Sequence, residues 1–130
     1  LRRKQTAEDF TPIPLVNEML DKLPPEVFSD PTKTFLDNSA GSGNFLVEVL
    51  RRKLSHNHSP LQAISTIYAV ELMPDNVEEM KERLLELLLP LSDEDLQKAK
   101  KIINHNIVCA NALTFDFENW KKPIRSKPLF

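Results

Sequence analysis

Glycine is scarce in this chain, which has only 2 among 130 residues. Both occur in the short segment Gly41-Ser42-Gly43. Glycine is the residue that enters left-handed backbone conformations without steric cost and lets another group approach the main chain closely. The placement of both glycines in one segment therefore predicts that the backbone has a special conformation there.

Cysteine and long apolar stretches are also nearly missing. The single Cys109 excludes a disulfide within the chain and favours a reducing, cytoplasmic location. The longest apolar run, 87–91, is far shorter than the roughly 18 residues of a membrane span. No signal-peptide pattern opens the sequence. We expect neither a disulfide-stapled scaffold nor a membrane protein.

A strong charge of either sign is absent as well, because the formal net charge is −2. The whole chain thus lacks a basic field for nucleic acid, and any such contact would come from local patches or from parts outside it. The length of 130 residues suits one domain. The chain does not begin with Met and ends at Phe130 without a helix cap, so we expect it to be part of a longer protein.

The segment around the glycines is typical of a strand, a tight loop and a helix. A short strand is expected over 33–37, ending in Asp37, and apolar residues recur at helical spacing from Phe45 to Leu54. The first N–H groups of such a helix are free to bind a ligand at the end of the sheet. This favours a site for an anionic or hydroxyl-rich ligand, although a Gly-Ser-Gly loop can also serve only to turn a strand into a helix.

Two further strands are expected, over 66–71 and 106–111, and each ends in a polar residue. Ligands of open α/β sheets bind outside the carboxyl ends of the strands. There, Glu71 can accept hydrogen bonds from both hydroxyls of a ribose, or it is simply a solvated acid. Asn111 has an amide that can both donate to and accept from a base edge.

The remaining pattern is helical. Thr11 is expected as the N-cap of an apolar helix that begins at Pro12, and Arg51-Arg52-Lys53 as the solvated end of the next helix. A loop is expected over 26–33, a short helix after Ser59, and two structural helices over 74–89 and from Ser92 onward. His56 and His58 have no third ligand nearby, so a metal site is not expected.

The order of these motifs resembles a known family. Phe10-Thr11-Pro12 precedes an apolar helix, and the segment 35–46 reads Phe-Leu-Asp-Asn-Ser-Ala-Gly-Ser-Gly-Asn-Phe-Leu. Both are similar to motifs of the adenine-specific (N6) DNA methyltransferases of restriction–modification systems, in which a Phe-Thr-Pro segment precedes an Asp-Pro-Ala-Cys-Gly-Ser-Gly-Asn-Phe-Leu loop. The strand ending in Glu71 and the strand followed by Asn111-Ala112-Leu113 come in the same order as in that family.

The resemblance implies that the cofactor is S-adenosylmethionine and assigns the residues that bind it. Thr11 and the loop would hold the methionine part, Asp37 would lie near its amino group, and Glu71 would hold the ribose. Leu72 would pack on the adenine ring, and Asn111 would contact its polar edge. The complete set of expected cofactor-binding residues is Thr11, Asp37, Ala40, Gly41, Ser42, Gly43, Asn44, Phe45, Glu71, Leu72, Asn111, Ala112 and Leu113.

The sequence also departs from the family pattern. Asn38 replaces a proline, Ala40 a cysteine and Asn111 the usual aspartate, and the catalytic Asn/Asp-Pro-Pro-Tyr/Phe motif is absent from the 130 residues. In the family that motif holds an adenine flipped out of the duplex. We therefore expect a cofactor-binding portion of an enzyme that methylates adenine in DNA, inactive on DNA by itself.

Other functions remain open. The alternatives are a methyltransferase of the same fold that acts on RNA or on a protein glutamine, and a non-catalytic fragment that binds a cofactor or a partner. A nicotinamide-dinucleotide site is less favoured, because the third glycine of G-x-G-x-x-G is missing. Expected partners are DNA, through regions mostly outside this chain, and a specificity or restriction subunit.

The expected architecture is a single α/β domain over 1–130, a partial Rossmann-like S-adenosylmethionine-dependent methyltransferase fold. Residues 1–25 would form the Phe-Thr-Pro helix, and 33–117 the core, with parallel strands in the order 3-2-1 and helices on both faces. The first strand, buried between helices but open at its edge, would offer a surface for self-association.

Overall fold

The computed structural model describes residues 11–121, and its centre is a parallel sheet of three strands. The strands are β1 (Phe35–Asp37), β2 (Ile67–Glu71) and β3 (Ile107–Cys109), and β2 lies in the middle. Phe35 pairs with Ile67, and Ala69 pairs with Ile107. The predicted strand order is confirmed. Each strand is shorter than predicted, and the third begins one residue late because Asn106 still belongs to the preceding helix.

Seven helices accompany the sheet in the described part of the chain: α1 (Ile13–Leu20), α2 (Glu26–Ser29), α3 (Asn44–Ser55), α4 (Pro60–Ser65), α5 (Pro74–Leu88), α6 (Asp93–Asn106) and α7 (Phe117–Lys121). The side chains of Ser59 and Ser92 cap α4 and α6, as their sequences predict. The predicted loop over 26–33 is wrong in part, because α2 occupies its first residues. The chain is a mixed α/β fold.

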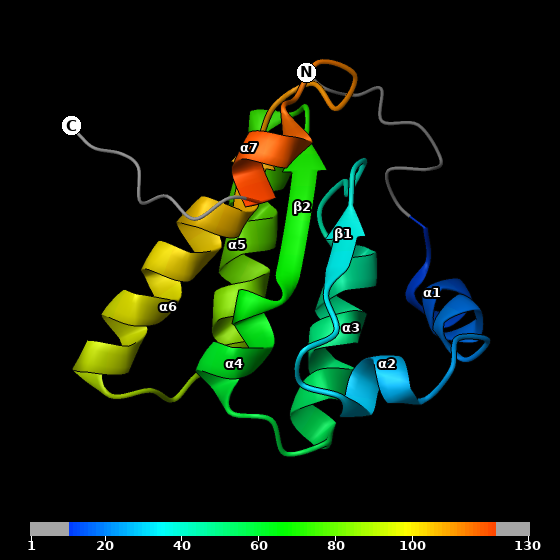
Figure 1. Cartoon of the computed structure of the whole chain (residues 1–130), viewed down its shortest axis with the longest axis vertical. Helices are drawn as coiled ribbons and strands as arrows, with labels where there is room; N and C mark the ends of the chain where they lie inside the picture. The colour runs from blue at the N-terminus through cyan, green and yellow to red at the C-terminus, as the bar shows by residue number, and fades with distance from the viewer. Residues whose placement is uncertain (1–10, 122–130) are drawn as a thin grey trace.

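The helices cover the two faces of the sheet unequally. Helices α3 and α5 pack on one face, behind the strands in Figure 1, and α7 lies in front of β2. On that front face the Trp120 ring meets Tyr68 edge-on, with ring centroids 5.0 Å apart. Leu36 of β1 remains 45% exposed. The expectation that the first strand is buried between helices is therefore wrong, because within the described residues β1 is an edge strand with little on its front face.

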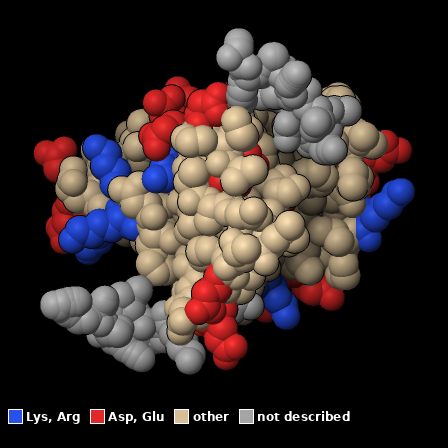
Figure 2. Space-filling view, turned by 90° about the horizontal axis from the view of Figure 1, so that it is seen from above, with Lys and Arg blue, Asp and Glu red and all other residues tan. Residues whose placement is uncertain are grey.

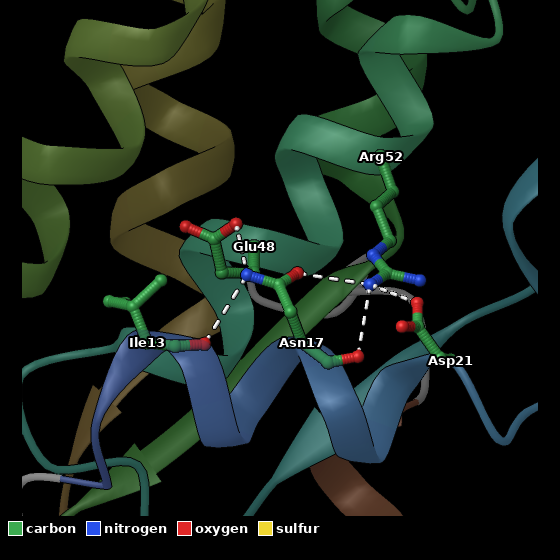
Figure 3. Close-up of polar contacts among 5 residues, drawn as sticks. All are labelled: Ile13, Asn17, Asp21, Glu48 and Arg52. Atoms are coloured by element: carbon green, nitrogen blue, oxygen red, sulfur yellow. Dashed lines mark hydrogen bonds and ion pairs between the residues drawn. The ribbon is translucent and has the colours of Figure 1, made fainter.

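Helix α1 is fastened to α3 by a network of polar side chains (Figure 3). The Asn17 Nδ2 group donates to Glu48 Oε1 at 3.2 Å, and Arg52 donates to Asn17 Oδ1 at 3.0 Å. The same guanidinium forms an ion pair with Asp21 at 2.7 Å. Glu48 is only 8% exposed, and the bond from Asn17 together with an ion pair to Arg51 at 3.5 Å satisfies its carboxylate. The network holds α1 beside α3, from Glu48 to Arg52.

The start of α1 differs from its prediction. Pro12, not Thr11, is the N-cap residue, and no side chain caps this helix. Thr11 instead contributes its backbone carbonyl to a contact with Asn44 described below. The residue Phe10 of the Phe-Thr-Pro segment lies outside the described residues.

The prediction for the basic run at the end of α3 is wrong in part, because Arg51 is exposed as expected but Lys53 is not. Lys53 is completely buried, and its Nζ donates to the Lys33 carbonyl at 2.7 Å, 5.4 Å from the centre of the Phe35 ring. Burial lowers the pKa of Lys53, and the charge of Asp30 opposes this effect. The long side chain crosses the layer between α3 and the sheet and fixes the chain just before β1.

Along the part of the chain that the structure describes, no helix has the length and apolar character needed to cross a membrane.

Candidate functional site

The glycine loop joins β1 to α3 in a left-handed conformation. Gly41 has a φ of 58° and Gly43 a φ of 98°. The Gly43 N–H donates to the Ala40 carbonyl at 3.0 Å, which closes the turn. Gly43 is also the N-cap of α3, and no side chain caps that helix. The N–H groups of the first turn are consequently donors without a capping side chain, as the sequence pattern predicts.

Glu71 faces this loop from the end of the neighbouring strand. Its carboxylate is buried, with 6% of the residue exposed, and Oε1 accepts a hydrogen bond from the Gly41 N–H at 2.7 Å. Oε2 accepts from the Met73 N–H at 3.0 Å and from Asn76 Nδ2 at 3.2 Å. The alternative of a merely solvated acid is therefore wrong: Glu71 ties the glycine loop to β2 and α5.

Asp37 lies at the end of β1, next to the same loop. Its Oδ1 accepts from the Ser39 N–H at 3.1 Å. Burial raises the pKa of Asp37 above the usual 3.8, the Ser39 bond opposes this, and the negative charge of Glu71 raises it further. Two carboxylates thus share one end of the sheet, an arrangement that favours a cationic ligand group beside Asp37.

The raised pKa of Asp37 predicts how stability depends on pH. Between the usual 3.8 and the raised value the folded chain binds more protons than the unfolded chain, so the free energy of unfolding falls as pH rises. Asp37→Asn keeps the acceptor for Ser39 and removes the charge. We expect the variant to be more stable than the parent at pH 7, by about 1.4 kcal/mol for each unit by which the pKa is raised.

Urea unfolding at several pH values measures this difference. The gap between Asp37→Asn and the parent should shrink as pH is lowered through the raised pKa of Asp37 toward the usual 3.8, because the parent carboxyl is then increasingly neutral as well. The prediction is contradicted if Asp37→Asn is less stable than the parent by the same amount at every pH.

Asn44 connects the loop with the segment before α1. Its Nδ2 donates to the Thr11 carbonyl at 2.7 Å, and its Oδ1 accepts from Arg83 of α5 at 2.9 Å. The same Arg83 nitrogen donates to the Ser42 carbonyl at 2.9 Å. Thr11, the loop and α5 are thus brought together around one amide.

The predicted residues that follow β2 and β3 are less closely joined to the loop. Leu72 is 60% exposed, and its carbonyl accepts from the Cys109 thiol at 3.5 Å. The Asn111 Oδ1 accepts from the N–H of Leu113, whose side chain is 92% exposed. Ala112 lies within this turn. The three residues from Asn111 to Leu113 form a surface turn, and their predicted contact with an adenine ring remains a prediction.

An apolar groove of about 380 Å³ opens beside the outer edge of β1. It is lined by residues of α1, the turn after α1, β1 and α3: Met19, Leu20, Leu23, Phe35, Leu36, Asp37, Phe45, Leu46 and Val49. Only Asp37 and Phe45 belong to the predicted cofactor-binding set. The groove shows that the edge of β1 is open within the described residues; the self-association expected there remains a prediction.

Charged groups are sparse in the middle of the face formed by the carboxyl ends of the strands. Figure 2 looks down on this end, and Lys, Arg, Asp and Glu lie mainly toward its rim. No group of three or more His, Cys, Asp or Glu residues in the described part of the chain is placed to hold a metal ion. The His58 Nε2 contacts the Ser29 carbonyl at 2.9 Å.

Two residues of this region were missed from the sequence, Asn76 and Arg83 of α5. They are separated by two helical turns and therefore lie on one face of α5. The available signal was two polar residues beside the apolar stripe of a helix that follows a strand ending in an acid.

Comparison with known proteins finds no family model that matches the chain, and no match among curated proteins or solved structures. The likeness to a methyltransferase family consequently rests on the motifs alone.

Proposed function

We propose that this chain is the cofactor-binding portion of an S-adenosylmethionine-dependent methyltransferase. More particularly, we propose an enzyme that methylates N6 of adenine in DNA. The observation that carries the first step is the 2.7 Å hydrogen bond between the Gly41 N–H and Glu71, which brings the glycine loop and the strand-end acid of the next strand into one site. The second step rests on the order of the motifs in the sequence.

The chemical character of the site suits the different parts of the cofactor. The uncapped first turn of α3 offers N–H donors to the methionine carboxylate. Asp37, whose charge is poorly solvated, suits the adjacent ammonium group, and the exposed Leu72 offers an apolar surface to the adenine. When bound, the cofactor supplies the methyl group.

Glu71 would bind the ribose through the acceptor positions of its carboxylate that remain free. A carboxylate offers about four acceptor positions, and three are used by Gly41, Met73 and Asn76. One ribose hydroxyl fits the remaining position. Binding of both hydroxyls, as the sequence suggested, requires one of the present bonds to open.

DNA would be held by groups beyond those described. The rim position of the charges in Figure 2 gives the visible face no broad basic surface. Since the catalytic motif is also absent from the 130 residues, we expect no methyl transfer to DNA by this chain alone.

Titration calorimetry tests the proposal. We expect the chain to bind S-adenosylmethionine and not NAD. Leu72→Asp should weaken this binding at least tenfold, because it places a charge against the adenine ring. Leu89→Asp is the matched control, since Leu89 is 48% exposed and lies at the other end of the 15-residue α5.

Comparison of the two leucine variants shows whether the cofactor binds beside Leu72. Equal affinity of the parent and Leu72→Asp would place the cofactor elsewhere. Absence of binding by the folded parent chain would refute the proposed function for this chain.

A further inference from the structure

One face of α5 contacts both the glycine loop and Glu71. Asn76 donates to Glu71, Met80 packs against Gly43, and Arg83 donates to the loop, at spacings of four and three residues along the helix. Residues at these spacings lie above one another on a helix. α5 therefore positions both the loop and Glu71 through contacts along one of its faces.

Arg83 makes two hydrogen bonds to the loop and the first residue of α3. One of its nitrogens donates both to the Ser42 carbonyl and to Asn44 Oδ1, each at 2.9 Å. With Oδ1 occupied in this way, the Asn44 amide points its Nδ2 at the Thr11 carbonyl. Removal of the guanidinium would leave a partly buried carbonyl and an amide oxygen without this donor, and the amide would no longer be held in one orientation.

We propose that Arg83 is a positioning residue that selectively sets the part of the site where the methionine end of the cofactor binds. This inference rests on the proposed function. The residues that it orients, Ser42, Asn44 and the Thr11 carbonyl, surround the N-terminus of α3. Glu71, which would hold the ribose, accepts from Gly41, Met73 and Asn76 and not from Arg83, whose bonds go to Ser42 and Asn44.

The two ends of the cofactor can be tested separately, because adenosine has the ribose and the base but no methionine part. Calorimetry with S-adenosylhomocysteine and with adenosine is carried out on the parent, Arg83→Gln and Arg83→Lys. We expect Arg83→Gln to lower the affinity for S-adenosylhomocysteine at least tenfold and the affinity for adenosine less than twofold. Arg83→Lys keeps a charged donor and should recover part of the loss.

Lys81→Gln is the control for charge, since it removes the same charge from the same helix. Lys81 lies in a separate surface groove with Glu78 and Lys100, so both ligands should bind to this variant as they do to the parent. Thermal melts show whether each variant is folded. If Arg83→Gln lowers the affinity for both ligands equally, Arg83 has a general structural role and the proposal is overturned. Unchanged affinity for both ligands would also overturn it.

A measurement without any ligand tests whether Arg83 orients the Asn44 side chain. The side-chain amide protons of Asn44 should exchange slowly with solvent in the parent and at least tenfold faster in Arg83→Gln. Unchanged exchange overturns the positioning role. Failure of the parent to bind S-adenosylhomocysteine refutes the proposed function instead, and the amide exchange then still shows whether Arg83 orients Asn44.

Discussion

Replacement of Gly43 by alanine should destabilise the chain by roughly 2 to 4 kcal/mol. A residue with a side chain at φ 98° costs about 1 kcal/mol relative to glycine, because this conformation lies beyond the ordinary left-handed region. The added Cβ would also lie 2.7 Å from the Met80 Cγ, and overpacking of this kind costs about 1 to 3 kcal/mol. Urea unfolding of the parent and Gly43→Ala measures the total.

A double-mutant cycle with Met80→Ala separates the two contributions. Met80 is fully buried, so its truncation alone is destabilising, by about 2 to 5 kcal/mol. It also removes the Cγ that the new methyl group would meet. The double variant should therefore be more stable than the sum of the single effects predicts, by about 1 to 3 kcal/mol. If the effects of the two single variants on the free energy of unfolding add within about 0.5 kcal/mol, contact with Met80 is not what disfavours a side chain at residue 43.

The sequence was a good guide to the strands and to the loop between them for a definite reason. Gly41 and Gly43 are the only glycines, and both have positive φ values, so composition alone located the special backbone. The strands were located because each is a short apolar run that ends at or just before a polar residue. These features are local, and local pattern is what a sequence expresses directly.

Two of the errors concern charged residues whose partners come from distant parts of the chain. Lys53 reads as part of a solvated helix end, yet its ammonium reaches the Lys33 carbonyl 20 residues earlier. Arg83 reads as one charge on a solvated helix face, yet it meets Ser42 across 41 residues. Long side chains can bury their stems and place a charged end on a backbone acceptor, and helical spacing alone does not reveal such an acceptor.

Glu71 shows how both kinds of information combine. Its position at the end of an apolar strand indicated a functional acid, which the structure leaves as a proposal. Its bonds to Gly41 and Asn76 reveal a second, structural role that the spacing of residues did not indicate. A loss of cofactor binding in Glu71→Ala would therefore not separate contact with the ribose from collapse of the loop.

Glu71→Gln should consequently change stability and binding together. The amide keeps one acceptor oxygen, but its NH₂ group must face at least one of three donors, those of Gly41, Met73 and Asn76. A buried donor left without an acceptor costs about 1 to 3 kcal/mol, and the loss of the charged acceptor adds to this. We expect Glu71→Gln to lower the free energy of unfolding by about 2 to 4 kcal/mol, measured by urea unfolding against Glu78→Gln, an exposed glutamate on α5.

The coupling to Asp37 distinguishes this explanation from general damage. The Glu71 charge helps to raise the pKa of Asp37, so its removal should bring that pKa closer to the usual 3.8. The stabilisation that Asp37→Asn gives at pH 7 should therefore be smaller in the Glu71→Gln background than in the parent. An equal stabilisation in both backgrounds would show that the two carboxylates do not interact, and the favourable place for a cation between the ends of β1 and β2 would lose its physical basis.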